Sequence, residues 1–249
     1  MASCNLWQKQ GTQEMERFLL QFFSDPSITR KGSLLNPESL DVFSDVDLEI
    51  HLKSNDILNI PKLLSVLEEQ IGEIFGYEIH SNASESVIRI VFCNFEAFDL
   101  SFFHDAIPVT MPNTTFEDKI INTVMQFWFI AYMAIIKIGR KDYLIASHLA
   151  LELCQLIIVL QMLERDKNKN TNFHRFGKQE DVPILHNLIY AGNDKKIHDK
   201  KDEILSVLFE AAEYMDNAVK HLGFNIANYI KLKEKAEELL GEEYTLNKL

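Results

Sequence analysis

The hydrophobic pattern of the chain changes period near Pro108 and Pro112, and this change restricts the folds open to it. Before the two prolines, apolar residues alternate with polar ones in short runs such as Val46–Leu52, which is the pattern of half-buried strands. After them, apolar residues recur at helical spacing over long stretches, the first of which is Ile120–Ile138. The sequence therefore predicts an α+β chain in which strands precede helices.

The change of period divides the chain into two predicted domains. Residues 1–110 are expected to form a mixed sheet with flanking helices, and residues 111–249 an all-α helical bundle. The elements expected in the first domain are a helix at Gln13–Phe23, strands at Ile28–Arg30 and Val46–Leu52, a helix at Pro61–Phe75, and strands at Tyr77–His80, Ser86–Cys93 and Ala97–Phe103. The helices expected in the second domain are Ile120–Ile138, Tyr143–Leu163, Asp181–Tyr190, His198–His221 and Ile226–Leu240.

Two local signals predict helix boundaries. Gly76 follows the second amphipathic run and predicts the end of that helix. Thr114 and Glu117 have the spacing of a capping box, which predicts the start of the helical domain.

Two apolar runs in the second half, Ile120–Ile138 and Tyr143–Leu163, are about long enough to span a bilayer. The first contains Asn122 and Gln126, and the second contains His148, Glu152 and two glutamines. Polar groups spread through a membrane span are costly. We therefore expect two core helices of a helical domain and no membrane partner. The apolar residues of this half leave room for a homodimer interface but do not require one.

The N-terminal residues and the cysteines indicate the cellular compartment. The first residues lack the apolar core and cleavage site of a signal peptide. Cys4, Cys93 and Cys154 are an odd number of cysteines, far apart and without metal-type spacing, which is typical of free thiols in a reducing compartment. The expected localisation is cytoplasmic.

The formal net charge of −12 limits the partners. Contacts to a nucleic-acid backbone require a basic surface, so we expect no nucleic-acid partner. An acidic surface raises the local concentration of cations, which suits a cationic small-molecule substrate. Solubility alone explains the charge equally well.

Acids occupy alternate positions at the start of the strand predicted at Val46–Leu52: Asp45 directly before it, then Asp47 and Glu49 within it. Residues two apart lie on one face, about 6.5 to 7 Å apart along the strand. Two carboxylates at that spacing can converge on one divalent cation, and hard oxygen ligands favour Mg²⁺ with phosphate oxygens as further ligands. We expect Asp45 and Asp47 to be the ligands and Glu49 to be solvated or supporting.

Gly32-Ser33 and Asp99 complete the predicted site. Glycine permits close backbone approach to a ligand, and Ser33 adds a hydroxyl and an N–H group that suit a phosphate. Asp99 lies between Phe98 and Leu100, on the polar side of an otherwise apolar strand, where a third metal ligand would be needed.

These residues resemble the nucleotidyltransferase fold of the DNA polymerase beta superfamily. Its pattern is Gly-Ser, a spacer of roughly ten residues, two aspartates two apart on a strand, and a third carboxylate on a later strand. Here eleven residues separate Ser33 from Asp45. The phrase FSDVDLEI looks like the acidic strand of bacterial antibiotic nucleotidyltransferases, and the two long helices are similar to the C-terminal region of lincosamide and aminoglycoside nucleotidyltransferases.

The resemblance implies Mg²⁺-dependent transfer of a nucleoside monophosphate, usually AMP from ATP, to a hydroxyl of a small molecule, here an amine-bearing one such as a lincosamide or aminoglycoside. Asp45 and Asp47 would hold Mg²⁺ against the triphosphate, Gly32 and Ser33 would hold its terminal phosphates, and Asp99 would bind a second metal ion near the attacking oxygen.

In several relatives an acid of the helical domain deprotonates the substrate hydroxyl. The corresponding candidates are Asp142 and Glu152, for which a helix N-terminus is the ordinary explanation of Asp142. Lys137 and Arg140 are candidates for contacts with the triphosphate, although exposed basic residues are common.

The spacer LLNPESLDVFS departs from the family pattern, because it lacks the usual glycine and basic residue, and Arg30-Lys31 rather than apolar residues precede Gly32. Two alternatives therefore stay open beside the small-molecule enzyme. One is AMP transfer to a protein, as in antitoxin-type nucleotidyltransferases, and the other is a catalytically inactive relative that binds a ligand or partner.

Overall fold

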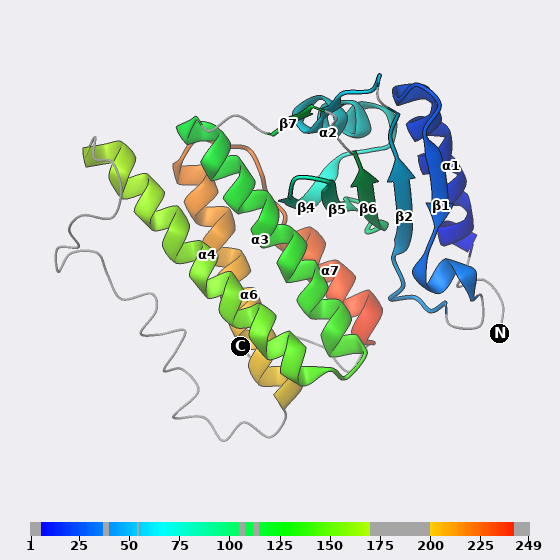
Figure 1. Cartoon of the computed structure of the whole chain (residues 1–249). Coiled ribbons are helices and arrows are strands. Elements are labelled where there is room, and N and C mark those ends of the chain that lie inside the picture. The colour runs from blue at the N-terminus through cyan, green and yellow to red at the C-terminus, as the bar shows by residue number, and fades with distance from the viewer. Residues whose placement is uncertain are drawn as a thin grey trace. The chain divides into compact units, whose positions relative to one another are not determined.

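The computed structural model describes residues 6–36, 40–53, 55–104, 108–111, 115–169 and 200–241. The chain separates into two compact units, Met1–Thr114 and Thr115–Leu249, which are described one at a time (Figure 1). The first is α+β and the second is helical, so the predicted fold class is confirmed.

The first unit is built on a five-stranded mixed sheet. Its elements are α1 (Leu6–Phe22), β1 (Ser27–Arg30), the 3₁₀ turn η1 (Gly32–Leu35), β2 (Val46–His51), β3 (Leu58–Asn59), α2 (Ile60–Gln70), β4 (Ile74–Ser81), β5 (Glu85–Phe92), β6 (Ala97–Phe103) and β7 (Val109–Thr110). The sheet order is β1-β2-β6-β5-β4, and β3 pairs with β7 as a separate ribbon. β2 and β6 are parallel neighbours, and the other pairs of this sheet are antiparallel.

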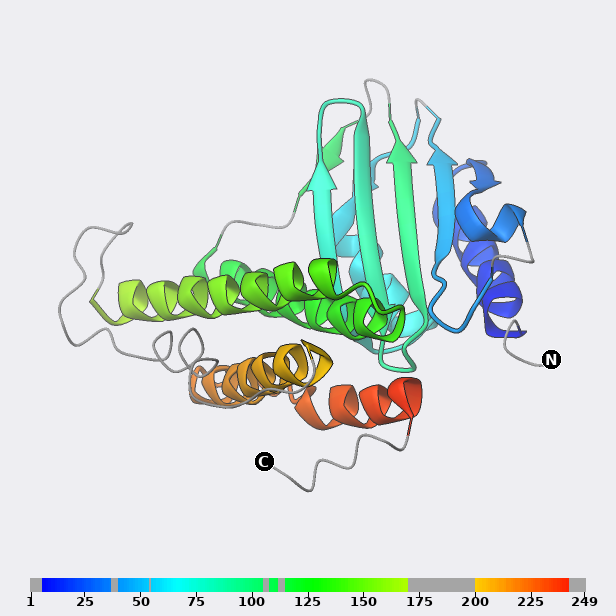
Figure 2. The same cartoon turned by 90° about the horizontal axis from the view of Figure 1, so that it is seen from below.

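The two faces of this sheet differ in chemistry. On β2, Val46, Leu48 and Ile50 are buried, and their partners in register on β6 are apolar as well. Helices α1 and α2 lie on one side of the sheet (Figure 2), where the Trp7 ring meets the Phe98 ring edge-on at 6.2 Å. Alternation therefore places the intervening polar residues of the strands on the opposite face.

The end of α2 differs from the prediction. The helix ends at Gln70 rather than Phe75, and Gly76 lies inside β4 at a shift of register instead of stopping the helix. The apolar spacing of Ile71 and Ile74 continues the helical pattern, but Gly72 has φ 156°, which a helix does not allow. Strand pairing then takes over, and Cys93 N–H donates to the Glu73 carbonyl at 2.8 Å.

The second unit contains α3 (Phe116–Gly139), α4 (Tyr143–Lys169), α6 (Lys200–His221) and α7 (Tyr229–Leu240) among the described residues. α3 packs along α4 and also contacts α6 and α7. The N-cap is Thr115, whose hydroxyl accepts from Asp118 N–H at 3.2 Å, so the capping pair lies one residue later than Thr114 and Glu117. The helix predicted at Asp181–Tyr190 lies outside the described residues.

Two of the described helices, α3 and α4, are long and apolar enough to cross a membrane by length and composition. In α3, 67% of the apolar window is buried inside the structure, and Trp128 is fully buried, as expected of a core helix. In α4 the buried share is 33%.

Candidate metal and nucleotide site

The polar face of the sheet carries one continuous row of charged side chains. In register across four neighbouring strands, Asp47 of β2 lies beside Asp99 of β6, Asp99 beside Arg89 of β5, and Arg89 beside Glu78 of β4. Adjacent strands are about 4.8 Å apart, so these side chains are direct neighbours. The two carboxylates that the sequence placed 52 positions apart, Asp47 and Asp99, are thus brought together by the one parallel pair of this sheet.

Asp47 is the electrostatic centre of this row. Burial first, and then the neighbouring carboxylates of Asp45 and Asp99, raise the pKa of its carboxyl to about 6, while the Arg89 guanidinium acts in the opposite direction. Asp45, Asp47 and Asp99 therefore form one group, called the acidic cluster below. Like charges this close favour a bound cation or a proton.

Gly32 is required where it stands. It adopts φ 57°, and a Cβ built on it would collide with Asp47 Oδ2 and lie 3.0 Å from Asp47 Cγ. Lys31 N–H donates to the Asp47 carbonyl at 3.0 Å, which holds the two segments together. Only a residue without a side chain lets the turn at Gly32 approach the carboxylate so closely.

Ser33 follows within the 3₁₀ turn η1, and although the residue is partly exposed, its hydroxyl oxygen is buried. Its Oγ has no hydrogen-bond partner among the described residues. A buried polar atom without a partner is costly unless a ligand or water satisfies it. This hydroxyl belongs to the residue that follows Gly32, which packs against Asp47, and it is chemically suited to donate to a phosphate oxygen.

The last part of the spacer before β2, residues 41–44, forms a hydrogen-bonded turn. Asp41 Oδ1 accepts from Phe43 N–H at 3.0 Å and from the Ser44 hydroxyl at 2.8 Å. Gln8 of α1, which is fully buried, donates from Nε2 to the carbonyls of Asp41 at 3.1 Å and Ser44 at 3.3 Å. These bonds fix the backbone directly before Asp45. The Asp-x-x-Ser pattern is a sequence signal that could have predicted this turn. The sequence holds no comparable signal for the role of Gln8.

Glu49 has its own partners on the same face. Its carboxylate accepts from Lys31 Nζ at 2.8 Å and from His51 Nε2 at 2.7 Å. The hydrogen bond from Lys31 and then that from His51 lower the pKa of Glu49. The structure thus places Glu49 in a surface ion-pair group beside the acidic cluster.

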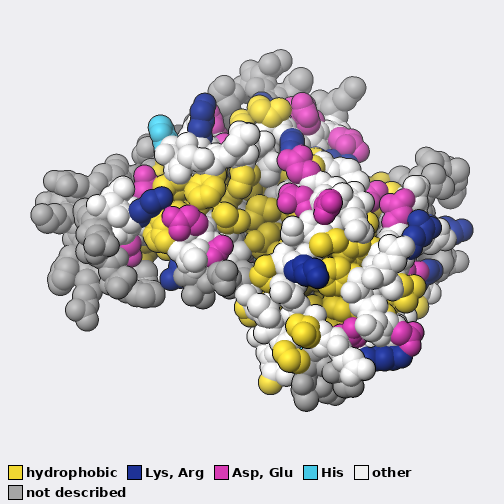
Figure 3. All heavy atoms as spheres, turned by 90° about the horizontal axis from the view of Figure 1, so that it is seen from above, with side chains coloured by type: hydrophobic (Ala, Val, Ile, Leu, Met, Phe, Trp, Pro, Cys, Tyr) yellow, Lys and Arg dark blue, Asp and Glu magenta, His cyan; other side chains and the backbone are white. Residues whose placement is uncertain are grey.

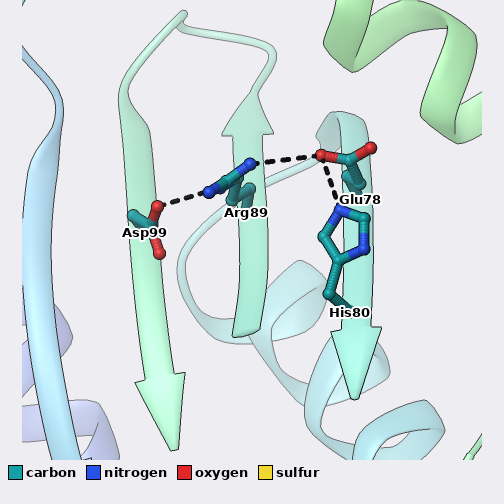
Figure 4. Close-up of polar contacts among 4 residues, drawn as sticks. All are labelled: Glu78, His80, Arg89 and Asp99. Carbon is teal, nitrogen blue, oxygen red and sulfur yellow. Dashed lines mark hydrogen bonds and ion pairs between the residues drawn. The ribbon is translucent and has the colours of Figure 1, made fainter. Parts of the chain in front are cut away.

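Arg89 is a member of the site that sequence reasoning missed. Its Nε donates to Asp99 Oδ2 at 3.0 Å, and its Nη1 lies 3.5 Å from Glu78 Oε2, which also accepts from His80 Nε2 at 3.1 Å (Figure 4). A single arginine in an alternating strand carries no signal of its own. Its place in the site can be recognised only when the register of β5 and β6 is known.

The residues present fit a magnesium–nucleotide complex better than an all-protein metal cage. Among the described residues, no group of three or more His, Cys, Asp or Glu side chains is placed to hold a metal ion. Mg²⁺ is usually bound by one or two carboxylates, with phosphate oxygens and water as the remaining ligands. Asp45 and Asp47 can supply the carboxylates, and the Ser33 hydroxyl, which has no partner among the described residues, could donate to a phosphate oxygen.

The remaining predicted site residues belong to the helical unit. Asp142 lies at the start of α4, where its Oδ1 accepts from Ile145 N–H at 3.4 Å, so it has the structural role of a helix cap. Glu152 is half-buried on α4, Lys137 is half-buried in the last turn of α3, and Arg140 is exposed directly after it. Their roles in nucleotide binding and catalysis stay predictions.

Comparison with known proteins gives no sequence-level relative. The chain matches no protein-family model and no curated protein. Among solved structures, it is similar to the polymerase core of TRAMP, an RNA surveillance complex, with 16% identity over 86% of this chain and a TM-score of 0.31. It spans 59% of the length of that chain.

Two further structures show similarity at the same level. An aminoglycoside 6-adenyltransferase from Bacillus subtilis has 11% identity over 96% of this chain and 99% of its own, with a TM-score of 0.32. The GLD-2/RNP-8 complex has 12% identity over 83% of this chain and 73% of its own, with a TM-score of 0.28. At these TM-scores the similarity carries no argument about activity, which is therefore argued from the residues of the site.

Proposed function

We propose that the protein is an Mg²⁺-dependent nucleotidyltransferase that moves AMP from ATP to a hydroxyl group of a small molecule. One observation carries the proposal: the turn at Gly32 packs directly against the Asp47 carboxylate, and the next residue, Ser33, has a buried hydroxyl without a hydrogen-bond partner among the described residues. A turn that can hold phosphate and a pair of carboxylates that can hold Mg²⁺ are thus adjacent, as binding of a metal–triphosphate complex requires.

The roles of the residues follow from this arrangement. Asp45 and Asp47 would hold Mg²⁺, which when bound offsets the negative charge of the triphosphate and of the departing pyrophosphate. Gly32 and Ser33 would orient the terminal phosphates. Asp99, paired in register with Asp47, would lie next to the attacking hydroxyl.

The reaction balances without a further reactant. The hydroxyl oxygen of the acceptor bonds to the α-phosphorus, the bond from that phosphorus to the bridging oxygen breaks, and pyrophosphate leaves. The hydroxyl proton passes to a carboxylate, for which Asp99, Asp142 and Glu152 are the candidates. A base in this role must come within hydrogen-bond reach of the hydroxyl.

The acceptor is expected to be cationic. The chain carries a net charge of −12, and on the face drawn in Figure 3 the Lys and Arg side chains are dispersed among Asp and Glu side chains. This distribution suits an amine-bearing molecule of the lincosamide or aminoglycoside class better than a phosphate backbone. We retain a cytoplasmic location as part of the proposal.

The test is pyrophosphate release from Mg-ATP with a panel of aminoglycosides and lincosamides. We expect release with at least one acceptor, and loss of release in Asp45→Asn and Asp47→Asn. Glu49→Gln, an acid of the same strand with its own partners, serves as the matched control and should retain activity. Absence of release with every acceptor, together with absence of ATP binding in calorimetry, would reject the proposal.

A second candidate is favoured by the ion pair between Arg89 and Asp99, because it engages the carboxylate that would face the attacking hydroxyl. This candidate is a protein that binds Mg-nucleotide and does not turn it over. Nucleotide binding that depends on Asp47, without pyrophosphate release from any acceptor, protein acceptors included, would support it.

A further inference from the structure

Arg89 is positioned between two carboxylates that belong to different parts of the sheet. Asp99 of the acidic cluster lies on one side and Glu78 on the other, each directly in register with it. The two contacts differ: Nε to Asp99 Oδ2 is an ordinary charged hydrogen bond at 3.0 Å, whereas Nη1 to Glu78 Oε2 is long at 3.5 Å. Glu78 is thus a second partner that the guanidinium only partly uses.

A positively charged group is needed here because the Asp99 carboxylate must be stable both with and without a bound cation. Its side chain is only 23% exposed and adjoins Asp47, which also interacts with Asp45, so without a partner Asp99 would add a third negative charge to this group. Arg89 supplies the opposite charge. A divalent cation bound to the same cluster would be repelled by that guanidinium and would compete with it for Asp99.

We propose that Arg89 is a built-in countercation of Asp99. When a divalent cation binds at the acidic cluster, the Arg89 guanidinium gives up its hydrogen bond to Asp99 and pairs with Glu78 instead. Arg89 is then a positioning residue, and Glu78 is the acceptor whose ion pair with Arg89 offsets the loss of the ion pair with Asp99. The inference rests on the proposed function in so far as it places a divalent cation at the cluster, but it requires no turnover.

The test is Mn²⁺ binding to the full chain without nucleotide, measured from free Mn²⁺ by electron paramagnetic resonance. Removing a positive charge next to a divalent cation should tighten binding on the order of tenfold even in a water-like dielectric, so Arg89→Gln should bind Mn²⁺ about tenfold more tightly. Arg89→Lys keeps the charge and should stay within about threefold of wild type. Arg30→Gln is the matched control, because Arg30 pairs with Glu16 of α1 on the other face, and it should leave affinity unchanged.

Glu78 separates the proposal from simple charge effects. Glu78→Gln should weaken Mn²⁺ binding by about threefold or more, because Arg89 then has no second acceptor. In the Arg89→Gln background the same change should have little further effect, since Glu78 acts through Arg89. An additive double variant, or weakened or unchanged binding in Arg89→Gln, would overturn the proposal.

The outcome is independent of the transfer reaction. Tighter Mn²⁺ binding in Arg89→Gln without pyrophosphate release from any acceptor would support the countercation and reject the enzyme. Pyrophosphate release together with unchanged Mn²⁺ affinity in Arg89→Gln would support the enzyme and reject the countercation. A wild-type protein that binds no Mn²⁺ without nucleotide would overturn the countercation, and the transfer reaction would still be decided by the pyrophosphate assay.

Discussion

Replacing Asp47 with asparagine should stabilise the protein in the absence of metal, although it removes a proposed metal ligand. In the folded protein, burial and the neighbouring Asp45 and Asp99 carboxylates raise the pKa of Asp47 from 3.8 to about 6. A carboxylate whose pKa is raised by folding destabilises the fold when it is ionised. The destabilisation is absent below about pH 4, grows as the pH rises through 6, and is complete above it.

The magnitude follows from the shift. About two pKa units correspond to roughly 3 kcal/mol at about 1.4 kcal/mol per unit, and because Asp47 is only half-buried, solvent screening reduces this to about 1–2 kcal/mol. Asp47→Asn should therefore gain about 1–2 kcal/mol of unfolding free energy at pH 8 with a chelator present, and almost nothing at pH 4. Millimolar Mg²⁺ should stabilise the wild type and narrow the difference.

The assay is hydrogen exchange in urea followed by mass spectrometry, with peptides of β2 and β6 reporting the first unit alone. Glu49→Gln is the control, because Lys31 and then His51 lower the pKa of that acid, and it should show no gain at pH 8. Equal stability of Asp47→Asn and wild type at pH 8, or an equal gain at pH 4 and pH 8, would refute the electrostatic reasoning.

Three further substitutions test the turn and the spacer. Gly32→Ala should cost about 1–2 kcal/mol, because a side chain at φ 57° is strained and collides with Asp47, and calorimetry should show nucleotide affinity reduced more than tenfold. Ser33→Ala should leave metal-free thermal stability unchanged or slightly higher, because the hydroxyl has no partner among the described residues, yet weaken nucleotide binding by about five- to tenfold, the value of one hydrogen bond. Gln8→Leu should cost about 1–3 kcal/mol in urea unfolding and weaken Mn²⁺ binding, because two buried carbonyls before Asp45 lose their donor. Nucleotide affinity equal to wild type in Gly32→Ala and Ser33→Ala would contradict the phosphate role of the turn.

The sequence was a good guide where one residue pattern decides one local structure. Alternation predicted β2 within one residue, because an apolar face buried against helices fixes which side chains point inward. The long apolar runs predicted α3 and α4 for the same reason. The predicted end of α2 was wrong, because Gly72 breaks the helical backbone before the apolar spacing ends.

Of the candidate site, the sequence indicated only the three aspartates and the Gly32-Ser33 pair. Strand order and register are set by the packing of the whole sheet. One sequence alone therefore does not predict that Asp47 pairs with Asp99 or that Asp99 pairs with Arg89. Gln8 was missed because its role depends on a contact between α1 and a turn more than thirty residues away. His104 shows the same limitation: a histidine at a strand end reads as a surface residue, yet it is buried and its Nε2 bonds the Ser86 hydroxyl at 2.9 Å.

The most direct test of the account is calorimetric binding of a non-hydrolysable ATP analogue to the wild type and to Asp47→Asn, with Mg²⁺ and with a chelator. The account predicts binding by the wild type that requires Mg²⁺ and that falls by at least about tenfold in Asp47→Asn, the loss of one charged ligand. Glu49→Gln should bind as the wild type does. Binding that is equally tight without Mg²⁺, or unchanged in Asp47→Asn, would contradict a metal–nucleotide site at Gly32, Ser33 and the acidic cluster.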